Sequence, residues 1–314
     1  MLLMNEKNSF ALVPRPPSAV ERAESSAKLI LASMVADTLA LVSRRGPGLA
    51  ETSPAEEDAA SLYERGLDFY YGRGTPKDFV AAAPLFRRAA GKGLAAAQYA
   101  LGVLLENGRG VTKDYAEAAK WYRLAAEEGH AEAQNNLGWM LAEGYGVPKD
   151  AVESVKWHRK AAEQGNAYGQ YNTGHAYCYG KGVAKDQAEA AKWFRKAAEQ
   201  GNAQAQNLLG IMYRDGKGVA QDYAEAVKWY RRAADQGNTG AQWDLGLRYL
   251  LGEGVPQDDF EAYKWLRLAV EQGRKDTGGA LIVAGASFSS QELQEAERWV
   301  RAFKPSRQGS IQTQ

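Results

Sequence analysis

Cysteine, net charge and long apolar runs are all scarce in this sequence. Its 314 residues include a single cysteine, Cys178, so no intrachain disulfide can form and small disulfide-stapled secreted scaffolds are excluded. The 39 basic residues nearly balance the 38 acidic ones, and the formal net charge is +1. A protein that binds a phosphate backbone usually carries a clustered excess of positive charge. We therefore predict a reducing compartment and no nucleic-acid partner.

The apolar stretches are too short and too interrupted to serve as membrane or export signals. The most apolar run, residues 29–42, contains Asp37 and falls short of the roughly 20 residues that span a bilayer. Near the N-terminus, Glu6 and Lys7 interrupt what would have to be the apolar core of a secretory signal, and prolines follow. We expect a cytoplasmic protein with no integral membrane segment.

Internal repetition is what the sequence has in abundance. Gly93 and Gly129 are 36 residues apart, and the same step recurs along most of the chain in four aligned series. These series are Gly93, Gly129, Gly165, Gly201, Gly237 and Gly273; Gly66, Gly102, Gly138, Gly174, Gly210 and Gly246; Asp78, Asp114, Asp150, Asp186, Asp222 and Asp258; and Trp121, Trp157, Trp193, Trp229 and Trp265. Chance does not produce four such series in register, so the chain contains six repeat units.

Residues 131–166 illustrate the first half of one unit. Ala133, Leu137 and Leu141 recur at the spacing that places them on one face of a helix. The following segment, residues 144–148, is rich in glycine and ends in proline, which breaks the helical pattern. The unit therefore begins with a helix and a turn.

A second helix is predicted to begin at Asp150. Aspartate is a favoured N-cap, and Glu153 three residues later completes a capping-box pattern. Trp157 and Ala161 then share a face with Ser154. Gly138, inside the first helix, costs about 1 kcal/mol relative to alanine, so we expect that it allows the second helix, which carries Trp157, to pack closely. Each unit is thus predicted to be a helix hairpin.

A lone hairpin cannot bury both of its faces, so neighbouring hairpins must stack to form a core. The predicted fold is all-α, a right-handed superhelical α/α solenoid of tetratricopeptide-like helix-hairpin repeats. Residues 289–303 begin with a capping-box pattern and continue with one apolar face, which predicts a terminal capping helix. The predicted organisation is an N-terminal extension (1–58), six repeats (59–94, 95–130, 131–166, 167–202, 203–238 and 239–274), a C-terminal capping helix (275–304) and a disordered tail (305–314).

The repeating residues resemble a known family. The pattern A-x-A-Q-x-x-L-G-x-x-Y-x-x-G-x-G-V-x-x-D-x-x-x-A-x-x-W-x-x-x-A-A-x-x-G, which residues 203–237 match nearly throughout, is similar to the Sel-1-like repeat, a relative of the tetratricopeptide repeat. The resemblance covers about residues 59–274. It implies an adaptor or scaffold in signalling or in the assembly of complexes. We expect a protein partner that binds through a peptide or helical segment. The resemblance names no partner.

Positions that vary between units are the candidates for specific binding, because packing explains the repeating ones. In related solenoids the first helices line a concave groove, and tyrosine, tryptophan and arginine are enriched in binding hot spots. The alternative is that several of these aromatics only pack between adjacent units. The predicted groove residues are Tyr63, Tyr70, Tyr99, Asn135, Trp139, Tyr168, Tyr171, His175, Tyr179, Asn207, Arg214 and Trp243.

A second class of function is an enzyme or small-molecule binder centred on His175 and Tyr179. His175 and Cys178 are three residues apart on one helical face, where a metal or nucleophilic pair could act. A closed zinc site needs four ligands, and the other soft donors, His130 and His158, lie in different units. We therefore predict no catalysis, no metal and no cofactor.

A third class is a membrane-associated assembly factor held by the N-terminal region. Residues 10–17 are proline-rich, and residues 27–41 have the apolar spacing of an amphipathic helix. That helix could dock on a partner, on a membrane surface or on its own solenoid, and residues 44–57 read as a linker. The oligomeric state stays open.

Overall fold

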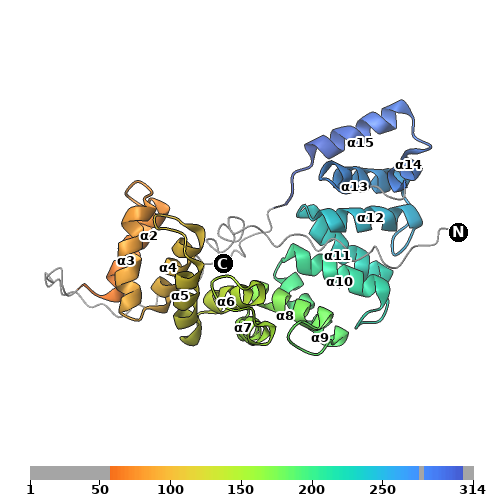
Figure 1. Ribbon diagram of the computed structural model, residues 1–314. Helices are drawn as coiled ribbons and strands as arrows, with labels where there is room; N and C mark the ends of the chain where they lie inside the picture. Colours follow the sequence, from red (N-terminus) through yellow and green to blue (C-terminus); the bar gives the residue numbers. More distant parts are fainter. Residues whose placement is uncertain (1–56, 276–278, 307–314) are drawn as a thin grey trace, which may run out of the picture. The chain divides into compact units, whose positions relative to one another are not determined.

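The computed structural model describes residues 57–275 and 279–306, and every regular element in these ranges is a helix (Figure 1). The chain divides into two compact units, Met1–Ala125 (unit 1) and Ala126–Gln314 (unit 2). The predicted all-α fold is confirmed. The N-terminal proline-rich stretch and amphipathic helix, and the tail beyond residue 306, lie outside the described residues.

Unit 1 contains two helix hairpins, and the last residues of its final helix belong to unit 2. The helices are α2 (Ala59–Tyr71), α3 (Phe79–Gly91), α4 (Ala95–Asn107) and α5 (Tyr115–Glu127). In the hairpin of α2 and α3, Leu62 and Phe86 are completely buried. Gly66 faces the Phe86 ring so closely that a Cβ there would lie 2.5 Å from a ring carbon.

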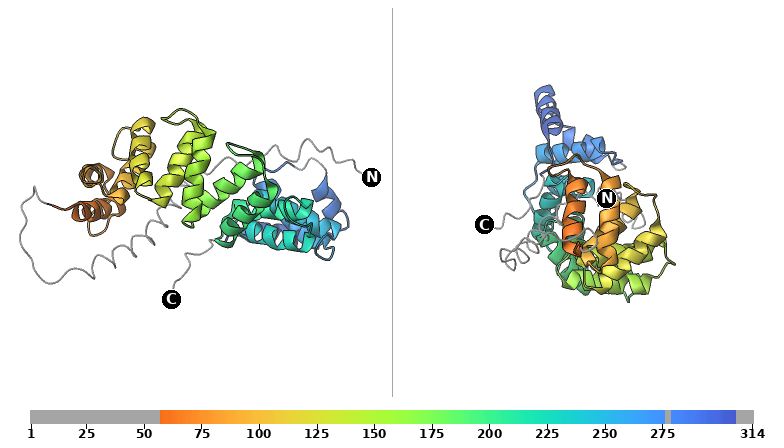
Figure 2. Two further views of the ribbon diagram at one scale, coloured as in Figure 1. Left: turned by 90° about the horizontal axis from the view of Figure 1, so that it is seen from below. Right: turned by 90° about the vertical axis from the view of Figure 1, so that its left-hand side faces the viewer.

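Unit 2 continues the hairpin pattern, and each helix from α6 to α13 packs against the next one along the chain (Figures 1 and 2). This order of contacts is that of a solenoid. The helices are α6 (Ala131–Glu143), α7 (Ala151–Glu163), α8 (Ala167–Tyr179), α9 (Gln187–Glu199), α10 (Ala203–Asp215), α11 (Tyr223–Asp235), α12 (Thr239–Leu251), α13 (Asp259–Glu271), α14 (Ala280–Gly285) and α15 (Ser290–Ala302).

The helical glycines allow the two helices of a hairpin to approach, as predicted, and the contacting residue is the one that follows the tryptophan. A Cβ on Gly138 would lie 2.8 Å from the Nδ1 atom of His158, the neighbour of Trp157. Gly174 faces Phe194 and Gly210 faces Tyr230 in the same way. A ring therefore occupies the space that the missing Cβ leaves.

Aspartates cap the second helices, whereas the predicted capping box does not close at Glu153. The carboxylate of Asp150 accepts a hydrogen bond from the backbone N–H of Glu153 at 2.8 Å. The Glu153 carboxylate accepts instead from the indole N–H of Trp157 at 3.1 Å. The reason is that the backbone N–H of Asp150 already donates to the carbonyl of Leu141, so it needs no second acceptor.

Buried glutamines join consecutive hairpins of unit 2. The side-chain amide of Gln170 donates to the carbonyl of Ala162 in the preceding hairpin, at 3.3 Å, and its own oxygen accepts from Gln200 at 2.7 Å. Gln206 repeats both bonds, with Ala198 and with Gln236. We call this series the glutamine ladder. It satisfies polar groups that would otherwise be buried without partners.

The C-terminal helix α15 covers the second-helix side of the last repeat. Ser289 and Glu292 form a complete capping box at its start. Val300 is buried, and the Trp299 ring meets the Trp265 ring edge-on at 5.1 Å. No described helix is long and apolar enough to cross a membrane.

Candidate protein-binding surface

The three predicted groove residues of unit 1 are packed inside that unit. Tyr63 and Tyr70 are 8% exposed and Tyr99 is 1% exposed. The Tyr63 ring lies 5.6 Å from that of Phe86, and the Tyr70 ring lies 5.1 Å from that of Phe79. These side chains leave little surface for a partner, so the candidate site is confined to unit 2.

The central part of the site in unit 2 is a row of rings along α8. Tyr171, His175 and Tyr179 are four residues apart, so they lie on one helical face. The ring centroids of Tyr171 and His175 are 6.2 Å apart, and those of His175 and Tyr179 are 4.4 Å apart. Tyr179 is 36% exposed, and Tyr168, one turn before Tyr171, is half-buried. The Tyr179 ring is therefore the accessible end of the row, whereas Tyr171 packs against the core.

The adjacent first helix, α6, contributes a second pair of rings. Trp139 stacks against Tyr145 with ring centroids 4.8 Å apart, and Tyr145 is 40% exposed. Tyr145 lies in the loop after α6 and was not among the predicted residues. Every other unit places a charged residue at its position, for example Arg109, Lys181 or Glu253, and this change of residue type was the available signal. We call Trp139, Tyr145, Tyr171, His175 and Tyr179 the first-helix face of unit 2.

Polar side chains beneath this face form hydrogen bonds that join α6 to α8. The side-chain oxygen of Asn135 accepts a hydrogen bond from the Asn172 amide at 2.9 Å and lies 3.2 Å from Nδ1 of His158. Burial, with a smaller effect of His175, lowers the pKa of His158 to about 3, so this imidazole is neutral at pH 7. The predicted binding oxygen of Asn135 is thus already used inside the protein.

Arg214, another predicted groove residue, is held in internal ion pairs. Its guanidinium donates to Asp215 at 2.7 Å and to Asp244 at 3.2 Å. Asp215 also pairs with Lys217 at 2.8 Å. Arg214 therefore links α10 to α12, and its charge is balanced within unit 2.

The last two predicted residues, Asn207 and Trp243, also have polar atoms or rings buried within unit 2. Trp243 is 7% exposed, and the guanidinium of Arg274 lies 5.3 Å from its ring centroid. The side-chain oxygen of Asn207 is buried and has no hydrogen-bond partner among the described residues. Of the predicted residues, those on α6 and α8 leave the most ring surface accessible.

His175 and Cys178 do not form the nucleophile pair considered from the sequence. The Cys178 thiol lies 3.7 Å from the side-chain oxygen of Gln187, and burial raises its pKa. Burial also lowers the pKa of His175 to about 4, with Lys181 acting in the same direction. Both groups are therefore neutral at pH 7, and no thiolate–imidazolium pair forms. Within the described ranges, no cluster of three or more His, Cys, Asp or Glu side chains could hold a metal ion.

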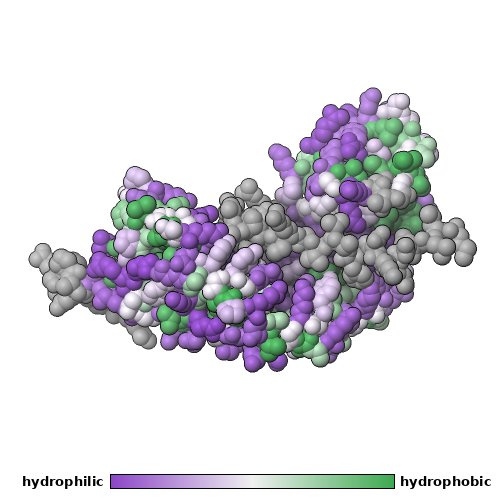
Figure 3. Space-filling view, viewed as in Figure 1, coloured by the Kyte–Doolittle hydropathy of each residue, from purple (hydrophilic) through white to green (hydrophobic). Residues whose placement is uncertain are grey.

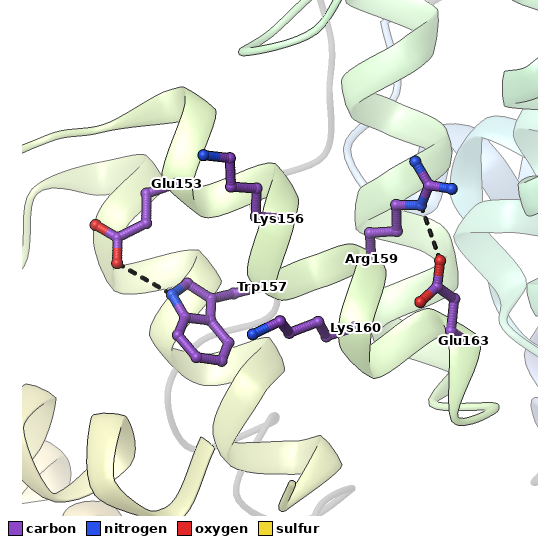
Figure 4. A pocket seen from close by; sticks show the side chains of 6 residues that line it. All are labelled: Glu153, Lys156, Trp157, Arg159, Lys160 and Glu163. Carbon is purple, nitrogen blue, oxygen red and sulfur yellow. Dashed lines mark hydrogen bonds and ion pairs between the residues drawn. The ribbon is translucent and has the colours of Figure 1, made fainter. Parts of the chain in front are cut away.

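A shallow pocket lies on the opposite, second-helix side, and one helix supplies all its walls (Figure 4). Lys160 places its amine 4.0 Å from the centre of the Trp157 ring, whose N–H is bound by Glu153. Arg159 is paired with Glu163 at 2.9 Å. Most of the polar groups here satisfy one another, which makes the pocket a weaker candidate than the first-helix face.

Hydrophilic residues cover much of the visible surface, with smaller groups of hydrophobic residues between them (Figure 3). One such group lies over α14, where Ile282 is 77% exposed and Val283 is 59% exposed.

Comparisons with known proteins agree with the repeat architecture. A sequence model of the Sel1 repeat matches residues 59–94, 95–130, 131–166, 167–202, 203–238 and 239–273. No curated protein matches the chain.

Two solved structures are similar to it. A protective antigen of uropathogenic Escherichia coli strains, which displays an SLR fold, is 41% identical with a TM-score of 0.70, over 78% of this chain and 53% of that one. This chain thus spans about half the length of that protein. A Sel1 repeat protein from Oxalobacter formigenes is 33% identical with a TM-score of 0.63, over 72% of this chain and 89% of that one. The chain therefore belongs to the Sel1 repeat family.

Proposed function

We propose that this protein is a non-catalytic interaction scaffold or adaptor that binds a segment of a partner protein on the first-helix face of unit 2. Sel1 repeat proteins generally mediate protein–protein interactions. A cytoplasmic location, which the single cysteine favours, is part of the proposal.

The observation that carries this proposal is the grouping of partly exposed rings on neighbouring first helices. Trp139 and Tyr145 come from α6 and its loop, and His175 and Tyr179 come from α8. Rings held by packing lose little conformational entropy on binding, so such groups provide much of the affinity at protein interfaces. The hydrogen bond between Asn135 and Asn172 joins the two helices that carry these rings.

The test is affinity capture from cell extract with the intact chain and with a Tyr145→Ala, Tyr179→Ala variant. A control is Lys156→Ala, because Lys156 is exposed on α7, on the second-helix side. Circular dichroism first establishes that both variants keep the helicity of the intact chain. We expect the double variant to lose a partner that the control retains. Equal capture by all three proteins would refute the assignment of this face.

A further inference from the structure

The loop that follows α8 places two lysines beside the exposed end of the ring row. Tyr179 is the last residue of α8, and Lys181 and Lys185 follow within the loop. The loop is held at both ends, because the N–H of Lys181 donates to the carbonyl of Ala176 and the N–H of Asp186 donates to that of Tyr177. The lysine backbones are therefore fixed with respect to the Tyr179 ring.

Corresponding loop cations in several other units have internal partners. The Arg73 guanidinium lies 5.0 Å from the centre of the Tyr71 ring, and the Lys113 amine lies 4.5 Å from that of Tyr115. Lys217 is paired with Asp215. Lys181 and Lys185 are both exposed, and neither has an ion pair or a ring contact within the described residues. Their charges are therefore available to a ligand.

The carboxylates near this loop have other partners within the protein. Asp186 accepts the backbone N–H of Glu189 at 2.9 Å as the cap of α9, and Asp215 is shared by Arg214 and Lys217. The electrostatic influences on α8 agree with this arrangement. Besides burial, Lys181 lowers the pKa of His175, and Lys185 and Lys217 oppose the rise in the pKa of Cys178 that burial causes. No carboxylate is among the causes of either shift.

We propose that the partner segment is acidic: an aromatic or large aliphatic side chain rests on Tyr179 and His175, and adjacent carboxylates pair with Lys181 and Lys185. This inference rests on the proposed function and specifies the chemistry of its ligand. The ring contact provides most of the affinity, since exposed ion pairs contribute little each. The lysines select partners by charge and accelerate association. Two free lysines are too few to hold a nucleic-acid backbone tightly.

The probe is a phage-displayed library of random linear peptides, selected on the intact chain. We expect the selected peptides to be enriched in Asp and Glu next to an aromatic or large aliphatic residue. Synthetic copies are then titrated by fluorescence anisotropy. Lys181→Glu with Lys185→Glu should weaken binding about tenfold and reduce its salt dependence, and Tyr179→Ala should weaken it about 30-fold. A peptide with its acids replaced by lysine should prefer the charge-reversed variant.

Lys156→Glu is the matched control, because Lys156 is an exposed lysine on α7, on the second-helix side. The Lys156→Glu variant should bind the selected peptides as tightly as the intact chain does. Peptides without an acidic excess, or full affinity in the charge-reversed variant, would overturn the inference. If Tyr179→Ala still weakens binding about 30-fold in that case, the first-helix face remains the binding surface and only the proposed ligand chemistry is wrong. If no peptide is selected, or if Tyr179→Ala also has no effect, both proposals fail. Tighter binding of oligouridine than of any peptide would likewise overturn an acidic peptide as the ligand.

Discussion

Replacing His158 by phenylalanine should make the protein less sensitive to acid. His158 is completely buried between α7 and Gly138 of α6, a position that phenylalanine occupies in the next hairpin at Phe194. Phenylalanine therefore fits the space. Asn135 keeps its hydrogen bond from Asn172 when the imidazole is gone, so no new unpaired oxygen is buried.

The magnitude follows from proton linkage. The pKa of His158 is about 3 in the folded protein, against an ordinary value of 6.5. As the pH falls below 6.5, the unfolded chain binds a proton that the folded protein refuses, so stability falls until the pH reaches about 3. Between about pH 7.5 and pH 5, His158 alone should lower the free energy of unfolding by about 2 kcal/mol.

His175 also lowers stability in acid, because its pKa is lowered to about 4. This residue is retained in the His158→Phe variant. The His158→Phe protein should therefore keep part of the acid sensitivity while losing about 2 kcal/mol of it. The assay is urea unfolding followed by far-UV circular dichroism at both pH values. The reasoning is wrong if the intact chain and the variant lose the same free energy of unfolding between the two pH values.

Two further substitutions test the packing of the repeats. Gly210→Ala should lower the free energy of unfolding in urea by about 1 to 3 kcal/mol, because the new Cβ would lie 2.7 Å from ring carbons of Tyr230. Replacing a helical glycine by alanine usually stabilises a protein, so a gain in stability would contradict this prediction. Thr239→Ala should raise the thermal midpoint and increase the free energy of unfolding by about 1 kcal/mol. The hydroxyl of Thr239 donates to Gln272 at 2.7 Å, while the buried side-chain oxygen of Gln242 has no partner. Without that hydroxyl, Gln272 is released to bond Gln242, as Gln200 bonds Gln170. Thr239→Ser, which keeps the hydroxyl, serves as the control and should show no gain.

The repeat period was sufficient to predict the helix hairpins, because each helix start and end carries its own local signal. Asp150 caps α7 and Gly144, with φ of 79°, ends α6 as expected. The identity of the residue facing Gly138 was not predictable in the same way. Trp157 and His158 are neighbours on the same helix, and only the rotation of α7 against α6 decides which one fills the space.

The site was harder to predict than the fold, because exposure depends on the next repeat rather than on local sequence. Tyr99 and Tyr171 occupy equivalent positions, yet Tyr99 is fully buried and Tyr171 is half-buried. Tyr145 was overlooked because it lies in a loop, outside the helical columns used for the prediction. The internal bonds of Arg214 could not be foreseen, since Asp244 lies in a different helix.

The glutamine ladder gives hairpins of unit 2 the same polar connection to their neighbours. The side-chain amides of Gln170 and Gln206 each donate to a backbone carbonyl at the same position of the preceding hairpin. If residues 167–202 were excised, Gln206 would meet Ala162 where it now meets Ala198, so this bond would form again, whereas Asn135 would lose its bond from Asn172. Duplication or loss of a whole repeat therefore preserves the ladder bonds between the hairpins that it joins, so such a chain can change its length by whole repeats in single genetic steps.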